Sequence, residues 1–524
     1  MSAPAVLGNP RTGTAWRLAL AALLLYAVSG GGRIAGSDEV TMFEVSRALL
    51  HGHVAVPEGA TLQGADGRFY SKNAAGQAVL ALPLTALAEG VTAVAPFTPE
   101  KRILVERALV SLFNAGVCAL LLAVFYGTAR ALGVGATAAL GAALMLGFTT
   151  PLWVYAKSFM AEPLEALGLL LALGGAARAV AGEKNAPRLA ALGVLIAVSS
   201  KLSVLPLALA CLLPFLALKP ATWRWPALGL ALAMLGHGVY DLARFGNLFE
   251  TGYGAQATPA AYSTPLRVGV YGLLLSSGKG VMWFAPALWL VPFGVAAMRR
   301  GVGPGPGPAG EVARLRARRL AASAIGMAWA AALVLYGRFQ HWAGDGSFGP
   351  RYLVPLLPLG FVPVAFACDR MRDARRTAAL GLAAAGLLVT LGGVAIYYGA
   401  QMREVGDYPY RLALDDPHFM EASHFNPRYT PVVGHWRMLV RNLGEHLRGE
   451  WPRLGGAGAP DARLGVSAED QHRLLHALDF WWAYALYEGV PAIPLLLAAL
   501  GIKLAALWVL WLAARAAGRE ARAP

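Results

Sequence analysis

Charged residues are scarce in this chain. Of its 524 residues, 57% are hydrophobic and only 14% are charged, whereas soluble proteins carry about 25% charged residues. The deficit is uneven, because long apolar runs alternate with short charged loops; the segment 377–401 has no charged residue at all. A helix needs about 20 predominantly apolar residues to cross a bilayer. The composition therefore excludes a soluble globular protein and predicts an all-α polytopic membrane protein.

Cysteines and acidic residues are also few. The three cysteines, Cys118, Cys211 and Cys368, lie inside apolar segments, so structural disulfides are not expected. Lys and Arg outnumber Asp and Glu by 45 to 30, and the formal net charge is +15. This excess collects in loops between apolar segments, which is typical of membrane topology. With no aromatic-basic motif for RNA or DNA, the sequence predicts no nucleic-acid partner.

Apolar segments recur along the chain and predict about twelve transmembrane helices. The first of them has the basic start of a signal peptide but no convincing cleavage site, so we retain it as a span. The predicted spans are 16–35, 103–127, 134–151, 160–181, 187–200, 203–218, 224–243, 281–298, 320–337, 351–368, 377–399 and 490–514.

A further apolar segment, 77–95, decides the orientation. If it does not cross the membrane, the arginine clusters within 299–319, 369–376 and 515–524 all lie on the side of the N-terminus. Because positively charged loops face the cytoplasm, we predict that 77–95 is an interfacial or re-entrant helix. Both termini are then cytoplasmic. The abundance of Ala, Gly, Arg and Leu is typical of a high-GC bacterium and predicts an inner-membrane protein.

The chain is expected to have three parts. Residues 1–400 form the transmembrane module, with a first outer loop at 36–102. Residues 401–489 form a polar and aromatic periplasmic loop or small cap, and 490–524 form the last transmembrane helix with a basic cytoplasmic tail. We find no internal repeat of the kind that many transporters contain.

Acidic residues at the outer ends of the spans are candidate functional residues, because a charge near the bilayer is expensive and usually lies in a wet cavity. Asp38 and Glu39 follow the first span, and Glu162 lies near the start of the span 160–181. A simple interpretation is that Asp38 and Glu39 stabilise the N-terminus of a short amphipathic helix. The functional interpretation is a general base and a metal ligand.

Cations are expected on the same side. Arg351 opens the span 351–368 from outside, against both the positive-inside bias and the helix dipole. A bound phosphate would resolve both conflicts, since a guanidinium offers a fork of donors; the alternative is an interfacial anchor made by Arg351 and Tyr352. The lysines expected to face this cavity are Lys157, Lys279, Lys201 and Lys72. The alternative for Lys157 is a lysine that reaches the headgroups, and the alternative for Lys72 is an ordinary surface lysine.

The order of these features resembles the GT-C superfamily of membrane glycosyltransferases, and in particular its protein O-mannosyltransferases and the aminoarabinose transferase of lipid A. Members share a first span, an acid in the first outer loop, two juxtamembrane helices and a second acid after the third span. Asp38-Glu39 match the first acid, 39–52 and 77–95 match the juxtamembrane helices, and Glu162 matches the second acid.

Short motifs extend the resemblance over about residues 16–400. Those similar to bacterial members that use phospholipid carriers are Gly349-Pro350-Arg351-Tyr352, Tyr70-Ser71-Lys72 with Gln77, and Gly278-Lys279-Gly280 with Trp283 and Pro286. Two departures stand out. Glu162 is followed by Glu165 rather than by an adjacent second acid, and residues 400–489 match no acceptor-binding domain.

The resemblance implies an inverting glycosyltransferase that moves a sugar from a polyprenyl-phosphate carrier to an acceptor on the outer face of the membrane. It implies Asp38 as the base or a metal-linked carboxylate, Glu39 as its competitor, and Glu162 as a residue that orients the acceptor or shares a metal. The residues expected around the phosphate are Arg351, Tyr352, Lys157, Lys279, Lys201 and Lys72.

The partners that follow are a polyprenyl-phosphate-linked sugar and membrane lipids. No cofactor is required, although a divalent metal ion on Asp38 and Glu162 is an option. The alternative function is a transporter or flippase of a lipid-linked sugar.

Overall fold

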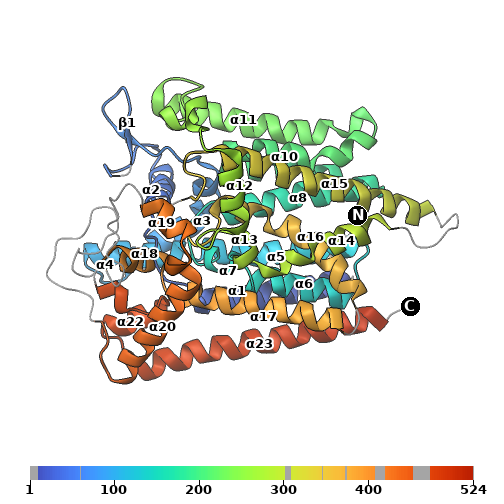
Figure 1. Cartoon of the computed structure of the whole chain (residues 1–524). Helices are drawn as coiled ribbons and strands as arrows, with labels where there is room; N and C mark the ends of the chain where they lie inside the picture. The colour runs from blue at the N-terminus through green and yellow to red at the C-terminus, as the bar shows by residue number, and fades with distance from the viewer. Residues whose placement is uncertain are drawn as a thin grey trace.

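The described part of the chain is almost entirely helical (Figure 1). The computed structural model describes residues 10–59, 61–300, 309–344, 346–371, 374–407, 419–452 and 473–522. Within these ranges the only strands are β1 (Leu62–Gln63) and β2 (Phe69–Tyr70), which pair antiparallel with Leu62 opposite Tyr70. The predicted all-α fold class is confirmed.

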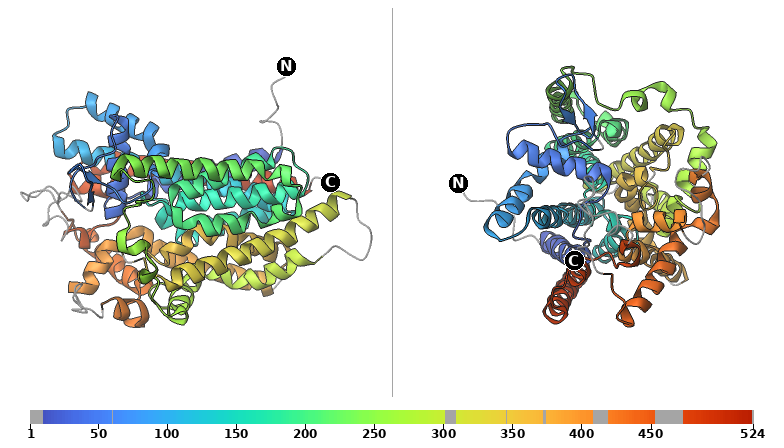
Figure 2. Two further views of the ribbon diagram at one scale, coloured as in Figure 1. Left: turned by 90° about the horizontal axis from the view of Figure 1, so that it is seen from above. Right: turned by 90° about the vertical axis from the view of Figure 1, so that its left-hand side faces the viewer.

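Long apolar helices run side by side and form one bundle (Figures 1 and 2). Seven helices in the described ranges are long and apolar enough to cross a membrane, and six shorter apolar helices accompany them. The bundle helices are α1 (Pro10–Ser29), α5 (Phe113–Ala131), α6 (Ala136–Phe148), α8 (Glu162–Val180), α9 (Ala186–Ser200), α10 (Leu205–Cys211), α11 (Arg224–Phe245), α14 (Val291–Arg299), α15 (Ala309–Arg338), α16 (Leu357–Arg370), α17 (Ala374–Ala395) and α23 (Ala492–Arg522). Each predicted span overlaps one of them, but two are composite: 103–127 begins in α4 (Pro99–Val110), and 281–298 also covers α13 (Val281–Phe284) and the 3-10 turn Pro286–Leu290.

Small residues allow the central helices to approach closely. A Cβ at Gly168 of α8 would lie 2.6 Å from the Ala197 nitrogen of α9, and one at Gly193 of α9 would lie 2.3 Å from the Ala172 nitrogen. Only glycine fits at such a contact, as is common where membrane helices pack without a hydrophobic driving force. This packing fixes the first residue of α8 relative to the last turn of α9.

The first loop folds into α2 (Ser37–Leu50), α3 (Gly76–Val94) and α4 (Pro99–Val110), which gather at one end of the bundle (Figures 1 and 2). We call this the α2–α3 end. By length and composition α3 is one of the candidate spans. However, Gln77 at its start donates to the Phe159 carbonyl at 2.7 Å, and its Glu89 lies 3.4 Å from Arg47 of α2. Both halves of α3 therefore contact other elements of the α2–α3 end, and its interfacial placement stays a prediction.

The start of α1 and the end of α23 lie together at the opposite end of the bundle (Figure 1). The Thr14 hydroxyl donates to the Glu520 carboxylate at 2.5 Å. The C-terminal ends of α14, α16 and α23, each with an arginine in its last turn, lie at this same end (Figure 1). The positive clusters and the α2–α3 end are therefore separated by the length of the bundle.

The described part of residues 401–489 packs at the α2–α3 end (Figure 1); residues 408–418 and 453–472 of this predicted loop or cap lie outside the described ranges. Its helices are α18 (Tyr398–Asp407), α19 (Phe419–Phe425), α20 (Pro431–Leu447) and α22 (Trp481–Tyr487). Short elements complete the chain: α7 (Leu152–Tyr155), α12 (Leu266–Leu275), α13 (Val281–Phe284), and 3-10 turns at Leu202–Val204, Leu213–Ala217, Pro220–Thr222, Gly254–Ala257, Pro259–Ala261, Pro286–Leu290, Arg351–Leu356, Pro427–Tyr429 and Leu474–His476.

Candidate active site

Arg351 joins two carboxylates that are far apart in the sequence. Its Nη1 lies 2.9 Å from Asp38 Oδ2, and its Nε donates to Glu162 Oε1 at 2.5 Å. Asp38 belongs to α2, Glu162 opens α8, and Arg351 opens the turn that leads into α16. Three residues predicted from three separate loops thus form one ion-pair cluster. The two carboxylates also balance the cation that the sequence places unfavourably at a helix N-terminus.

Two of the predicted lysines join this cluster. Lys201, which follows the last turn of α9, has its Nζ 4.0 Å from Glu162 Oε1 and 5.0 Å from the ring centre of Tyr352. Lys72 has its Nζ 4.0 Å from Asp38 Oδ1. Tyr352 stacks on Tyr336 of α15, with ring centres 4.6 Å apart. The packed backbone of α8, α9 and α15 therefore positions the positive side of the site.

Asp38, Arg351 and the two lysines lie in the wall of a cavity of about 450 Å³, whereas Glu162 is buried and is not among the lining residues. One part of the wall is charged and another is apolar. The charged lining residues are Asp38, Lys72, Lys201, Asp241, Arg244 and Arg351. The apolar and aromatic ones include Met42, Leu202, Leu205, Leu335, Tyr253 and Phe339. A cavity with this division suits an amphiphile with an anionic head.

Asp38 and Glu39 are neighbours with different environments. The buried Glu39 carboxylate accepts the backbone N–H of Gly36 at 2.7 Å and that of Phe159 at 2.5 Å. It thereby caps α2 and ties α2 to the segment before α8. Successive residues on a helix point about 100° apart, and Asp38 instead faces Arg351 and the cavity. The geometry favours Asp38 over Glu39 as the reacting carboxylate.

The electrostatics of Asp38 follow from this position. Burial raises its pKa, but the charges of Arg351 and Lys72 and the hydrogen bond from Arg351 outweigh burial and lower the pKa to about 2. Asn73 steadies the same turn, since its amide donates to the Thr41 hydroxyl at 3.0 Å and to the Asp38 carbonyl at 3.4 Å. Asp38 is therefore ionised at neutral pH and held in one place. For Glu39, burial outweighs the backbone hydrogen bonds that the carboxylate accepts, and its pKa is raised.

Glu39→Gln is expected to lower stability more than chemistry. In glutamine one of the two carboxylate oxygens is replaced by an NH₂ group, which cannot accept a hydrogen bond. One of the two buried backbone N–H groups therefore loses its acceptor, at a cost of about 1–3 kcal/mol. Thermal unfolding of the purified protein would measure this loss. Glu58→Gln, an exposed acid of the same loop, is the control. An unchanged melting temperature in Glu39→Gln would contradict the capping role.

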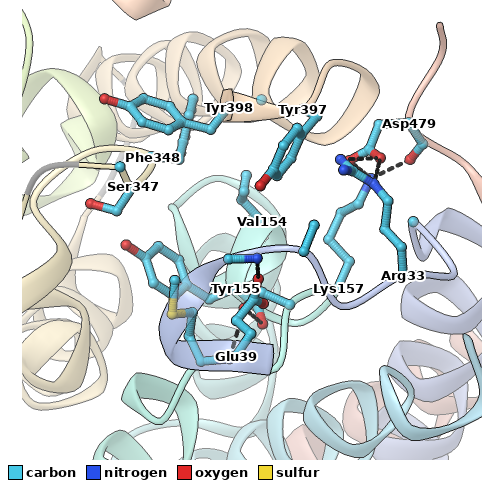
Figure 3. A pocket seen from close by; sticks show the side chains of 17 residues that line it. Arg33, Glu39, Val154, Tyr155, Lys157, Ser347, Phe348, Tyr397, Tyr398 and Asp479 are labelled. Carbon is cyan, nitrogen blue, oxygen red and sulfur yellow. Dashed lines mark hydrogen bonds and ion pairs between the residues drawn. The ribbon is translucent and has the colours of Figure 1, made fainter. Parts of the chain in front are cut away.

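Lys157 lies apart from Arg351. Its Nζ lies 3.0 Å from Asp479 Oδ2 and donates to the Val394 carbonyl at 2.6 Å. Arg33 approaches the other oxygen of Asp479 at 2.8 Å, and Figure 3 shows the two cations converging on this carboxylate. They line a second, smaller pocket of about 80 Å³. Lys157 thus belongs to an ion-pair cluster with Arg33 and Asp479 and does not line the larger cavity.

The stability of the Asp479 cluster is expected to depend on pH. Burial raises the pKa of Asp479, but Arg33 and Lys157 outweigh it and lower the pKa from 3.8 to about 2. A depressed folded-state pKa contributes stability that is fully present above the unfolded value and is lost as the pH falls through 4 towards 2. The loss amounts to about 2 kcal/mol.

Thermal melts of wild type and Asp479→Asn between pH 7 and pH 3 would check this. The wild type should lose stability more steeply below pH 4 than the variant, because the variant cannot titrate at this position. The control is Glu450→Gln, whose partner Arg448 is on the exposed surface. Equal slopes in wild type and Asp479→Asn would show that this carboxylate does not stabilise the fold by its charge.

Lys279 is fully buried and contacts the loop that precedes Arg351. Its Nζ donates to the Ser347 carbonyl at 2.7 Å and lies 3.3 Å from the Ser347 hydroxyl. The same loop turns at Gly344 and Gly349, whose positive φ angles of 68° and 65° favour glycine. Lys279 is not in the lining of the larger cavity, and its contacts hold the loop from which Arg351 emerges.

Several residues of the two pockets were not predicted. Asp241 and Arg244 pair at the rim of the larger cavity, and they lie at the end of the apolar segment 224–243, so the rule that identified Arg351 also applies to them. Arg33 at the end of the first span offered the same signal. Asp479 offered none, because it lies in a polar segment where an acid is unremarkable.

The predicted metal site does not fit the geometry. Asp38 and Glu162 both contact Arg351, and this guanidinium supplies the positive charge that a divalent ion would bring. Among the described residues, no group of three or more His, Cys, Asp or Glu side chains gathers in a way that could hold a metal ion. No step proposed below uses a metal.

No protein-family model and no curated protein matches this chain. It is similar to two crystal structures of ArnT from Cupriavidus metallidurans. The one bound to undecaprenyl phosphate has a TM-score of 0.47 and 17% identity, over 87% of this chain and 83% of that chain. The apo structure has a TM-score of 0.48 and 16% identity, over 87% and 74%. ArnT is the lipid A aminoarabinose transferase, one of the GT-C branches that the sequence resembles.

Proposed function

We propose that this protein is an inverting glycosyltransferase that moves a sugar from a polyprenyl-phosphate carrier to an acceptor on the outer face of the membrane. One observation carries the proposal. Arg351 lines a large cavity together with Asp38, Lys201 and Lys72, and it bridges Asp38 to Glu162, which is buried and not part of the lining; Lys201 and Lys72 each lie 4.0 Å from one of these carboxylates. Such a site contains both a proton acceptor and cations for a phosphate leaving group.

The phosphate binds where the cations converge. Arg351 offers several donors in a planar fork that matches phosphate oxygens, and Lys201 and Lys72 add two flexible charges. All three line the same cavity. In a site that excludes bulk water these charges stabilise the departing phosphate more strongly than they would in water.

The lipid chain lies against the apolar part of the wall. Leu202 and Leu205 follow α9, and Leu335 and Phe339 lie at the end of α15. Helix α11, which also lines the cavity, presents a row of exposed apolar side chains that includes Leu235, 63% exposed. A polyprenyl tail can therefore leave the cavity between apolar helices while its phosphate stays at Arg351.

The transfer exchanges one bond at the anomeric carbon of the sugar. The acceptor oxygen or nitrogen attacks from the face opposite the phosphate, and the bond from carbon to phosphate oxygen breaks. Donor binding separates the Asp38–Arg351 ion pair, so that the sugar lies between the two side chains. The acceptor proton then goes to Asp38, and polyprenyl phosphate departs beside Arg351 and Lys201. Asp38 is a weak base while these cations face it. A bound phosphate offsets their charge, so the pKa of Asp38 rises when the donor is in place.

The test is a transfer assay with purified protein in lipid. A panel of short-chain polyprenyl-phosphate sugars is supplied with candidate acceptors, and release of polyprenyl phosphate is measured. Release by wild type and its loss in Asp38→Asn and Arg351→Ala support the proposal. Lipid binding without release across the whole panel would contradict it and favour the transporter.

A further inference from the structure

One face of helix α20 is buried and carries both apolar and polar side chains. Met438 and Asn442 are fully buried, and the Asn442 amide donates to the Leu475 and Ala477 carbonyls at 3.1 and 3.0 Å. On the flank, Arg441 lies 2.7 Å from Glu404 of α18. These contacts fix the rotation of the helix about its axis.

The other face of α20 is an exposed apolar stripe. Val433, Val440, Leu443 and Leu447 are 61%, 67%, 43% and 89% exposed. Trp436 lies between them, so the apolar positions follow one another at intervals of three and four residues. This spacing places all five on one side of a helix. A water-facing helix of a small cap would carry polar residues there.

The stripe continues the lipid-facing surface of the bundle. The Trp436 indole N–H donates to the carbonyl of Leu388 in α17 at 2.8 Å, and the Leu388 side chain is itself 56% exposed. At the other end, His446 lies 2.7 Å from the hydroxyl of Tyr487. Tyr487 closes α22, just before α23.

Helices α17 and α23, which the stripe connects, are both apolar, and other parts of the protein leave most of their surface exposed. The span window of α17 is 39% buried and that of α23 is 11% buried. Near the start of α23, Ile493 is 75% exposed. Figure 1 shows α20 beside α22, at the end where α17 finishes and α23 begins. The stripe thus connects two uncovered apolar surfaces of helices that are long and apolar enough to cross a membrane.

We propose that α20 is an interfacial helix whose apolar stripe inserts into the membrane leaflet at the α2–α3 end. The partner is the lipid bilayer itself. A large apolar face with arginines on the flanks is the pattern of helices that lie in the plane of the interface. The described part of the region that the sequence presents as a periplasmic loop or cap is therefore seated on the membrane through α20.

Spin labels on single cysteines test this placement. The protein is reconstituted in bilayer vesicles after the native cysteines are replaced, and the labels are introduced as Val440→Cys and Leu447→Cys. Collisions with oxygen, which partitions into lipid, are compared with collisions with a water-soluble nickel complex. The controls are Glu450→Cys for water and Leu504→Cys of α23, 58% exposed, for lipid. Melting temperatures confirm that each variant is folded.

The expected result is oxygen access at 440 and 447 that resembles Leu504→Cys, with a depth of about 5–10 Å below the headgroup boundary. Nickel access equal to that of Glu450→Cys would overturn the proposal and leave α20 in water. Spin–spin broadening between labels of two molecules would also overturn it, because the stripe would then be covered by a second copy. The outcome is independent of the transfer assay, since no substrate is used.

Discussion

Replacing Arg351 by alanine is expected to lower kcat/KM for sugar transfer by about 10²–10³-fold, which corresponds to about 3–4 kcal/mol of lost transition-state stabilisation. The guanidinium is the one described cation in contact with both Asp38 and Glu162. In the proposed mechanism it stands where the leaving phosphate gains charge. Without it, Lys201 and Lys72 remain but cannot offer a planar fork. Steady-state kinetics with a fixed donor and acceptor would measure the loss.

Stability must be separated from chemistry in this experiment, because removing one partner of a buried ion pair also destabilises the fold. Arg351→Lys keeps the charge and should fold better than Arg351→Ala while remaining slow, since an ammonium cannot contact both carboxylates and the phosphate. Arg267→Ala removes an exposed arginine and should be as active as wild type. Full activity in a folded Arg351→Ala variant would refute the assigned role.

Asp38→Asn is expected to reduce kcat by about 10²–10⁴-fold, the usual contribution of a positioned general base. The donor KM is expected to fall, because the variant no longer competes with the phosphate for Arg351 and Lys72. This split between kcat and KM distinguishes a base from a residue that merely supports the fold. It is measured by initial rates over a range of donor concentrations.

The neighbouring carboxylates supply the comparison. Glu39→Gln should change the melting temperature more than kcat, since Glu39 accepts only backbone N–H groups. If Asp38→Asn kept full kcat and Glu162→Gln lost it, the base would be Glu162. If both kept it, the proposed chemistry would be wrong.

Much of the site was predictable because a charge beside a bilayer is costly. The same rule selected Asp38, Glu162, Arg351 and Lys201, and these four residues do come together. Lys72 of the first outer loop, for which an ordinary surface lysine was the alternative, joins them at Asp38. The helices were predictable for a related reason: apolar length is a local property of the chain, and positive loops limit the ways to thread it.

The same rule cannot tell which partner a charge finds. Lys157 and Lys279 satisfied it equally well, yet Lys157 pairs with Asp479, 322 residues away, and Lys279 contacts Ser347. The choice between Asp38 and Glu39 was equally open, because two adjacent acids look alike in sequence. Only the rotation of α2 against the Phe159 backbone separated a cavity residue from a capping residue.

The sequence by itself determined that this is a membrane protein, where its helices lie and which ends carry costly charges, because hydrophobic burial depends on runs of neighbouring residues. The tertiary structure decided which charges share a cavity, which are consumed in packing, and that α20 exposes an apolar stripe beside α17. Ion pairs act over a few ångströms. Their partners are therefore fixed only when helices distant in sequence have been packed together.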